Sequence, residues 1–429
     1  MYSHCTIKID GFSSFQSLPL IGFLVCLATL PLGYIFFLAL IVVFALAAIL
    51  SPSAGVRLRR EDRWFLLALL LFGLHLVLDA WRSGAPMGHQ TASTLPWWPL
   101  VAALVLVAWR RVPPCTVALW WGAAFGALWA GGAALVRWLP SGVARVRLPD
   151  INAIPFGNLS LMLGALSLVS ILRLSQISRS DFRGFTLQFL FGVAALAGLV
   201  ASLLSGTRGG WVTLPVVAVV LFLCQGAEIR RLWSAWSLQT RLLAVAGVVL
   251  VAAFAVWQAL PRAVALVEDL RGYLHQGVTR TSVGLRLDMW HAAWVLFLQK
   301  PLLGWGEGAM MPELRRLIAA GELNEQARYF GFQLHSDVLD TLARRGLLGL
   351  ITLLLMYAVP LAGFVRRLKC ADVDVRTFAL AGTLVVLMFA GFGLTQSQFR
   401  DERSFAAYLV LVVTCWVLMR PRPIDPVKS

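Results

Sequence analysis

The side chains best suited to chemistry in this sequence are a histidine and several arginines near the ends of apolar segments. His335 stands directly before Ser336, a short distance ahead of an apolar segment that starts near Gly346. Histidine exchanges a proton more readily near neutral pH than any other side chain, so His335 is a candidate general base. A single histidine can also be structural, and this alternative stays open.

Arg208 lies in the small-residue break 205–211 (SGTRGGW) between two apolar segments. Glycine lets the backbone approach a ligand closely, and the N-terminus of the helix that follows favours an anion. A guanidinium in this break could therefore bind a phosphate at membrane depth. The alternative is a tight turn whose arginine extends to the membrane interface.

Arg286 and Trp290 are four positions apart, so they share one face of a helix. The arginine could bind phosphate while the indole contacts a sugar or a lipid tail, or the pair could be a surface cation resting on an aromatic ring. Arg344 and Arg345, near His335, are further candidates for substrate binding. The turn 301–308 (PLLGWGEG) lacks the Gly-Lys-Ser/Thr ending of a phosphate loop and is interpreted as a backbone hinge.

Composition places these residues in a membrane protein. The chain has 429 residues, of which 59% are hydrophobic and only 14% charged, which predicts an all-α polytopic membrane protein. The net charge of +16 comes from short basic loops, which suit lipid headgroups and indicate no nucleic-acid partner. None of the six cysteines lies in the polar segment 261–345, so no disulfide framework is expected there. No cleavable signal peptide is expected, because the first apolar run continues into a second.

About twelve transmembrane helices are predicted, since a span needs about 20 apolar residues. Alternate loops collect arginine and lysine, which predicts that both termini are cytoplasmic and that the long segment 261–345 is periplasmic. This gives three parts: spans 1–9 in residues 1–260, a periplasmic loop with short helices in 261–345, and spans 10–12 with a cytoplasmic tail in 346–429. The predicted spans are Leu18–Leu50 (two helices with a turn at Pro31–Gly33), Trp64–Asp79, Leu95–Trp109, Thr116–Trp138, Ile154–Leu174, Phe185–Leu204, Trp211–Cys224, Leu242–Leu260, Gly346–Val365, Phe378–Leu394 and Phe405–Met419.

The acidic residues do not form a recognisable metal site. The single Asp-x-Asp sequence, at 372–374, falls in a predicted cytoplasmic loop. Asp337 and Asp340 follow His335 without other recognisable ligands, and are expected to be solvated, with tuning of the histidine as the alternative. The loop 396–398 opens on the same side as His335 and could contact sugars. No metal or other cofactor is therefore expected.

Four motifs, taken in order, resemble the O-antigen ligase family, whose superfamily also includes O-antigen polymerases and bacterial O-oligosaccharyltransferases. His335-Ser336, nine intervening residues, Gly346 and then Gly349 resemble one signature of that family. The break at Arg208, the Arg-x-x-x-Trp at 286–290 and the Pro-x-x-Gly-x-Gly at 301–306 resemble the others. The likeness covers about 184–349 in motifs and the whole chain in topology.

The resemblance implies a fold like that of GT-C-type glycosyltransferases and an enzyme of lipopolysaccharide biosynthesis in the bacterial inner membrane, active on the periplasmic face. The donor would be a glycan on undecaprenyl pyrophosphate and the acceptor lipid A-core oligosaccharide, with transfer independent of metal and inverting at the anomeric carbon. His335 would be the catalytic base or would orient the acceptor. Arg208 and Arg286 would neutralise the leaving pyrophosphate, and Trp290, Arg344 and Arg345 would contact substrate.

Other functions remain as alternatives. A polymerase of O-antigen or exopolysaccharide would use the same lipid-linked donor but extend one glycan with another. A transporter would be expected to show internal repeats between its halves, and none is evident because the long loop falls late in the chain. A non-enzymatic assembly scaffold would leave His335 dispensable.

Overall fold

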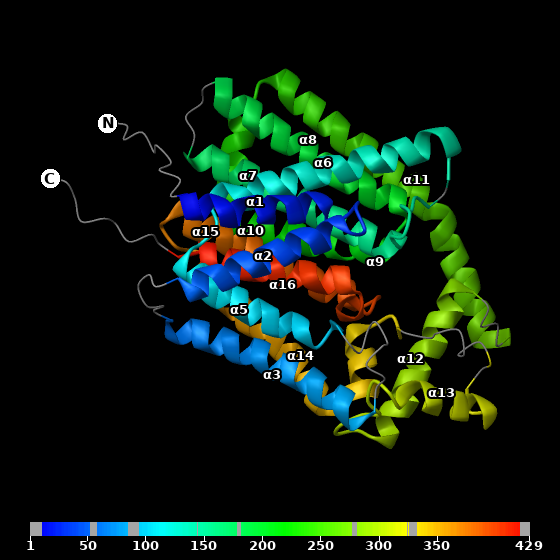
Figure 1. The fold of residues 1–429 in the computed structure, drawn as a ribbon. Helices are drawn as coiled ribbons and strands as arrows, with labels where there is room; N and C mark the ends of the chain where they lie inside the picture. Colours follow the sequence, from blue (N-terminus) through cyan, green and yellow to red (C-terminus); the bar gives the residue numbers. More distant parts are fainter. Residues whose placement is uncertain are drawn as a thin grey trace.

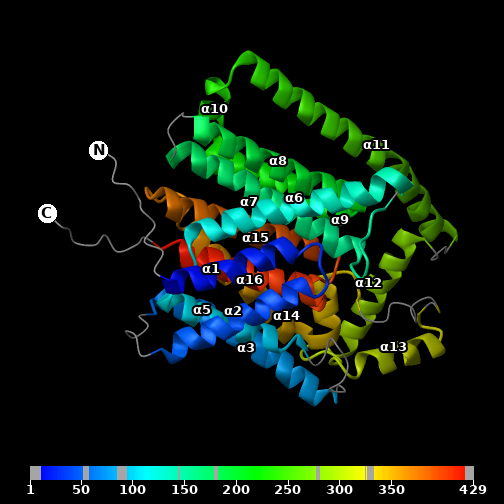
Figure 2. The same ribbon diagram turned by 45° about the horizontal axis from the view of Figure 1, so that its top comes forward.

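The computed structural model describes residues 11–51, 58–84, 94–143, 145–177, 182–276, 281–323, 325 and 333–420. The two chain ends, predicted to be cytoplasmic, lie outside these ranges. Within them the regular structure is helical, and a single isolated bridge joins Leu148 to Ile151. Long helices run side by side, and two shorter ones gather near the end of α3 (Figures 1 and 2).

The predicted apolar segments all fall on helices. Eight helices of the described chain are long and apolar enough to cross a membrane, so the protein is a polytopic membrane protein. Others, such as α1, α5 and α16 with 16, 15 and 17 residues, do not meet that criterion, and the predicted count of twelve spans is not established. The helices on the predicted segments are α1 (Gly11–Cys26), α2 (Gly33–Leu50), α3 (Arg60–Arg82), α5 (Trp97–Arg111), α6 (Thr116–Ser141), α7 (Ala153–Ile177), α8 (Phe182–Ser205), α10 (Thr213–Ala235), α11 (Leu238–Gln276), α14 (Asp337–Val365), α15 (Val373–Gly393) and α16 (Glu402–Leu418).

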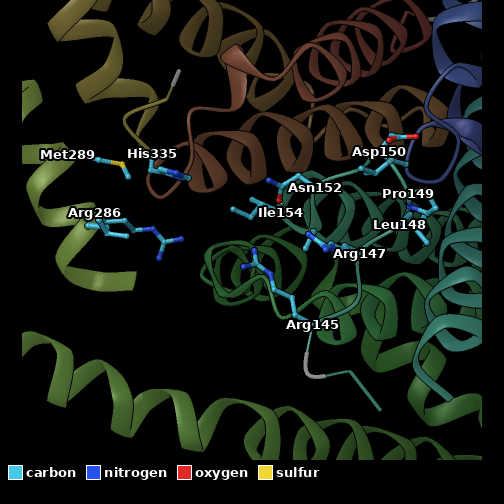
Figure 3. A pocket seen from close by; sticks show the side chains of 13 residues that line it. Arg145, Arg147, Leu148, Pro149, Asp150, Asn152, Ile154, Arg286, Met289 and His335 are labelled. Carbon is cyan, nitrogen blue, oxygen red and sulfur yellow. Dashed lines mark hydrogen bonds between the residues drawn. The ribbon is translucent and has the colours of Figure 1, made fainter. Parts of the chain in front are cut away.

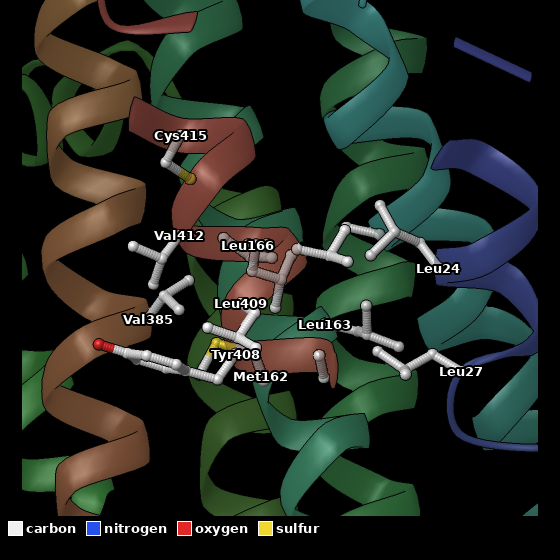
Figure 4. Close-up of a cluster of buried hydrophobic side chains, with 14 of the residues drawn as sticks. Leu24, Leu27, Met162, Leu163, Leu166, Val385, Tyr408, Leu409, Val412 and Cys415 are labelled. Atoms are coloured by element: carbon white, nitrogen blue, oxygen red, sulfur yellow. The ribbon is translucent and has the colours of Figure 1, made fainter. Parts of the chain in front are cut away.

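The centre of the bundle is made by α7, α15 and α16, whose side chains are buried almost all round, whereas α2 and α10 are mostly exposed. A helix that is apolar on every face belongs in such a position. Side chains of these three helices interdigitate with those of α1, as in the cluster around Leu163, Val385 and Leu409 (Figure 4). This core is the fixed frame against which the polar connections are held.

Small residues let α7 and α8 approach each other at backbone distance. A Cβ atom added to Gly198 would lie 2.5 Å from the carbonyl oxygen of Ser160, and one added to Gly164 would lie 2.9 Å from the carbonyl oxygen of Ala195. Membrane helices associate mainly through such close packing, since lipid tails are as apolar as the side chains they would replace. The pair therefore forms a rigid wall on one side of the bundle.

The predicted boundary at residue 261 does not coincide with a helix end. α11 continues through Pro261 as one helix of 39 residues, which corresponds to about 58 Å at 1.5 Å per residue. This length exceeds the roughly 30 Å of a bilayer's hydrocarbon core. The helix therefore extends from the bundle into the segment 261–345, which also contains α12 (Ser282–Gln299) and α13 (Met310–Ala319).

Two of the glycine motifs dock against each other through their backbones. Gly304 (φ 63°) and Gly346 (φ 60°) both adopt the left-handed conformation that glycine tolerates best. The amide of Gly306 donates to the carbonyl of Arg344 at 2.7 Å, and that of Leu347 donates to the carbonyl of Pro301 at 2.8 Å. Gly346 also interrupts the helical geometry inside α14. The turn 301–306 is thus held directly on the kink of α14.

Buried acidic residues mark the two ends of α3. Asp62, in the first turn, pairs with Arg110 at 2.6 Å and also contacts Arg420. Asp79, near the last turn, pairs with Arg82 at 2.9 Å and with Arg345 at 3.4 Å. Each carboxylate pairs with a separate group of arginines, so α3 contributes a buried ion pair at each end of the bundle.

Candidate active site

A cavity of about 950 Å³ opens at the end of the bundle where α3 ends and α14 begins. Its walls come from the connection 145–154, which leads from α6 into the first turn of α7, from one face of α12, and from His335 ahead of α14 (Figure 3). Four side chains in it can carry positive charge: Arg145, Arg147, Arg286 and His335. Figure 3 shows the guanidinium groups of Arg145 and Arg286 directed towards the space between these elements.

His335 is placed by a strained backbone and a helix cap. Its φ is 51°, a left-handed value that few residues other than glycine adopt. The next residue, Ser336, is the N-cap of α14, and its hydroxyl accepts a hydrogen bond from the amide of Leu339. Such strain persists only where the surrounding structure holds it, and it concentrates at functional sites.

One ring nitrogen of His335 is held by a glutamine. Its Nδ1 lies 2.5 Å from Oε1 of Gln396, whose amide nitrogen donates in turn to Oε1 of Gln333. A carbonyl oxygen only accepts, so in this arrangement Nδ1 carries the proton. The lone pair is then on Nε2, which is the atom able to accept a proton from a substrate hydroxyl.

The surroundings of His335 favour its neutral form. Burial lowers the pKa of His335 from 6.5, and the positive charge of Arg286 lowers it further. The hydrogen bond with Gln396 and the charge of Asp340 act in the opposite direction without cancelling the effect. The imidazole is therefore neutral near pH 7, as a general base must be.

Arg286 projects from α12 on the opposite wall of the cavity. It is half-buried, and burial together with the nearby charge of Arg145 lowers its pKa from 12.5. Within the described residues, neither Arg286 nor Arg147 forms an ion pair with an acidic side chain. A guanidinium that is partly removed from water and lacks a carboxylate partner favours a bound anion.

Arg145 and Arg147 contribute the rest of the positive charge. They flank Val146, which is fully buried and whose amide donates to the carbonyl of Leu204 at 2.9 Å. Val146 is buried between the two arginines, which are both exposed and line the cavity, so the anchored Val146 fixes the position of both. The sequence alone gives these two arginines no specific role, because the fixed position of the connection 145–154 depends on contacts with α8.

Arg208 lies beside this cavity but is not one of the residues that line it. It is exposed and begins the short helix α9 (Arg208–Trp211). The preceding Thr207 is buried, and its hydroxyl donates to the carbonyl of Ala153 at 2.8 Å. Because Ala153 belongs to the cavity wall, the break 205–211 is fastened directly behind that wall.

Trp290 is not among the residues that line the cavity. It packs against a second apolar cluster that includes Ala293, Leu314 and Leu334. On the same helix, Leu285, Arg286 and Met289 line the cavity. Arg286 and Trp290 therefore have different surroundings although they are one helical turn apart, and the indole lies among the contacts that hold α12 against α13.

Arg344 and Arg345 are buried in an ion-pair cluster behind the site. Glu307 accepts from both of them at 3.3 Å and from Arg400 at 2.7 and 2.8 Å. Asp340 pairs with Arg344 at 2.8 Å. The three arginines hold the pKa of Glu307 well below its usual value despite burial, and the carboxylates raise the pKa of Arg400. The cluster joins the turn 301–308, the start of α14 and the 3₁₀ helix η2 (Gln398–Arg400).

The expectation that Asp337 and Asp340 are solvated is wrong. Both are buried, with 5% and 2% of their surface exposed. Asp337 accepts from the amide of Phe399 at 3.1 Å and from the hydroxyl of Tyr357, so residues distant in sequence satisfy it. Asp340 belongs to the ion-pair cluster, and its charge also acts on His335.

Among the residues that the structure describes, no group of three His, Cys, Asp or Glu side chains is arranged to hold a metal ion. The chemical groups gathered around the cavity are instead one neutral imidazole and three guanidinium groups. Together they can bind a phosphate-containing group on one side and accept a proton on the other. That combination suits the transfer of a group from a phosphate leaving group to a hydroxyl.

Comparison with known proteins adds a family to this geometry. Residues 192–354 match the family described as O-antigen ligase, which confirms the resemblance seen in the motifs. The matched segment contains His335, Arg208, Arg286, Trp290, Arg344 and Arg345. A protein of Haemophilus influenzae, described as uncharacterized, is 24% identical over 272 residues, which cover 63% of this chain and 65% of that protein. The alignment thus spans less than two thirds of that relative.

Proposed function

We propose that this polytopic membrane protein, whose residues 192–354 belong to the O-antigen ligase family, transfers a glycan from undecaprenyl pyrophosphate to the sugar of lipid A-core. In this proposal the cavity faces the periplasm, the protein lies in the bacterial inner membrane, and both termini are cytoplasmic. The observation that carries the proposal is the placement of His335 in one cavity with Arg145, Arg147 and Arg286.

The arginines would bind the pyrophosphate of the donor. As the bond between the anomeric carbon and the phosphate oxygen breaks, negative charge grows on the leaving group, and fixed cations stabilise it. Each charge-assisted contact contributes roughly 1.5 to 3 kcal/mol. Arg286 from α12 and Arg147 from the connection 145–154 are on opposite walls, so a pyrophosphate between them would be held from two sides.

His335 would act on the acceptor. Its Nε2 takes the proton of the acceptor hydroxyl while that oxygen forms the new bond to the anomeric carbon. The pyrophosphate leaves from the opposite face with the bonding electrons, so a single displacement inverts the anomeric configuration. The proton on His335 is then released to solvent, which returns the imidazole to its neutral form, and no group is oxidised or reduced.

The test compares purified wild type with His335→Asn, using undecaprenyl-pyrophosphate glycan and lipid A-core with EDTA present. Asparagine tolerates the left-handed backbone of this position, so this variant is expected to keep the thermal stability of wild type. Transfer to lipid A-core by wild type alone is the expected result. Equal transfer by the variant would refute the role of His335, and glycan extended on glycan without lipid A-core would make the protein a polymerase.

A further inference from the structure

A second cavity, of about 700 Å³, lies at the end of the bundle opposite His335. It is formed by the first turn of α3, the last turns of α14 and the end of α16. Four arginines and one glutamate supply its charged groups, so its lining is strongly positive: Arg59, Arg60, Arg366, Arg367 and Glu61. This group of residues has no part in the proposed transfer reaction.

The arginines in this cavity are not equivalent. Arg367 contacts Glu61 and donates to the carbonyl of Gly363 at 3.1 Å, so its position is fixed by the protein. Within the described chain, Arg60 and Arg366 are exposed and form no ion pair with an acidic side chain. These two guanidinium groups are therefore available to an anion, and each offers the forked pair of donors that suits a phosphate.

Apolar stripes lead out of the cavity along both α3 and α14. On α3 the exposed side chains follow helical spacing from the cavity towards the other end of the bundle, at Trp64, Leu67, Leu71, Leu74 and Leu78. On α14 a matching stripe is formed by Val365, Ala362, Ala358, Leu354 and Ile351. Trp64 and Ala362 belong both to these stripes and to the cavity wall. The charged cavity is thus continuous with surface that hydrocarbon covers in a membrane.

This combination distinguishes a lipid from a free anion. A free phosphate would use the guanidinium groups alone and gain nothing from the stripes. A phospholipid would place its phosphate among the arginines and its acyl chains along α3 and α14, with Trp64 at the boundary where indole rings are favoured. Basic pockets between membrane helices are known to suit anionic headgroups.

We propose that the cavity between α3 and α14 binds an anionic glycerophospholipid, with Arg60 and Arg366 on its phosphate and its acyl chains along the two stripes. The site lies at the end of α14 remote from His335, so lipid bound there would join α3 and α14, the two helices that also carry Asp79 and Arg345 of the ion-pair cluster. The proposal is independent of the transfer reaction.

The experiment uses native mass spectrometry of the full chain in detergent, with phosphatidylglycerol and phosphatidylcholine of matched acyl chains in competition. Wild type is expected to retain phosphatidylglycerol preferentially. The variant Arg60→Gln/Arg366→Gln should weaken that binding about tenfold or more, since each basic residue near an anionic lipid contributes about 1 kcal/mol. The control variant Arg63→Gln/Lys369→Gln removes the same charge at the same end, outside the cavity, and should change binding less than about twofold.

Three results would overturn the proposal. Equal retention of the two lipids by wild type would show no preference for an anionic headgroup, and this arm needs no variant to fold. Equal loss of binding in both variants would assign the effect to diffuse surface charge. Displacement of phosphatidylglycerol by millimolar inorganic phosphate would assign the cavity to free anions.

Discussion

Nδ1 of His335 and Oε1 of Gln396 lie 2.5 Å apart, although 61 positions separate the two residues in the chain. The contact joins His335, two residues before α14, to the connection between α15 and α16. The hydrogen bond places the proton on Nδ1. The lone pair is then on Nε2, which can accept a proton from a substrate hydroxyl. Gln396, from the C-terminal part of the chain, therefore fixes the tautomer of the candidate base His335.

Replacing His335 with asparagine should abolish most of the transfer. Asparagine keeps the left-handed backbone but has no basic nitrogen, so kcat should fall by about 10²- to 10⁴-fold, the usual contribution of general base catalysis. The measurement is the initial rate of glycan transfer, with donor binding measured in parallel. A variant with wild-type kcat would mean that His335 has no catalytic role.

Replacing Gln396 should alter the histidine without touching the arginines. In Gln396→Leu, Nδ1 loses its acceptor, so the population of the competent tautomer falls and kcat should drop about tenfold or more while donor KM changes little. Gln396→Glu keeps an acceptor and adds a negative charge, which favours the imidazolium and raises the pKa of His335. The acidic limb of its pH-rate profile should therefore move to higher pH. An unchanged pH-rate profile would show that Gln396 does not influence the protonation of His335.

The rate of transfer by wild type should increase with pH in the acidic range and level off by about pH 7, because burial and the charge of Arg286 lower the pKa of His335 from 6.5. Arg286→Gln removes a positive charge beside the imidazole, so the pKa of His335 should rise and the acidic limb should shift to higher pH. Donor binding should weaken in the same variant. A limb that stays in place would show that another group limits the rate.

Gly346→Ala should destabilise the protein. Its φ of 60° and ψ of −158° define a conformation essentially confined to glycine, which costs another residue about 1–3 kcal/mol, and the added Cβ would lie 2.4 Å from the backbone carbon of Leu302. A fall in free energy of unfolding of about 2 kcal/mol or more is expected, measured as a lower Tm in detergent. Gly132→Ala is the control, since nothing lies within 4 Å of a Cβ there, and it should be neutral or slightly stabilising. Similar Tm values for the two variants would contradict the docking of turn 301–306 on α14.

Glu307→Gln should destabilise the ion-pair cluster by about 3–5 kcal/mol, because three buried arginines lose a common carboxylate. The control is Glu322→Gln, whose 4.0 Å pair with Arg316 is half exposed on both sides and should cost less than about 1 kcal/mol.

The same cluster predicts a pH dependence of stability. The folded-state pKa of Glu307 is depressed, so its stabilisation is fully present above the unfolded pKa of about 4.3 and is lost as pH falls through the folded value. The difference in Tm between wild type and Glu307→Gln should therefore narrow in acid. A difference in Tm that does not change with pH would show that the stabilisation does not come from the charge of Glu307.

The helices and the candidate base could be predicted from sequence, since long apolar runs and a histidine beside one of them are local signals. The end of α11 could not, because Pro261 sits inside a run that stays helical on both sides. The positions of Arg344 and Arg345 depend on Glu307, which lies 37 and 38 positions away. Local spacing gives no information about such partners. From sequence alone these arginines are therefore candidates for substrate binding rather than members of a buried cluster.

The positions of Arg145 and Arg147 in the candidate site could not be predicted from sequence either. Apart from their spacing around Val146, these two arginines do not differ in sequence from other basic residues near apolar segments. They face the cavity because Val146 is anchored to Leu204 on α8, a contact that only the folded chain defines. The useful local signal is the pair of arginines around one buried apolar residue in a short connection.

The ion-pair cluster around Glu307 also has a consequence for synthesis of the protein. Asp79, whose carboxylate accepts a hydrogen bond from the amide of Glu307, is synthesised 228 residues before it, and Arg400 follows Glu307 by another 93. A growing chain therefore inserts most of its helices while this cluster is still incomplete. The cluster can be completed only after Arg400 has been synthesised, so a chain that stops before Arg400 would contain most of the apolar helices but not the complete cluster.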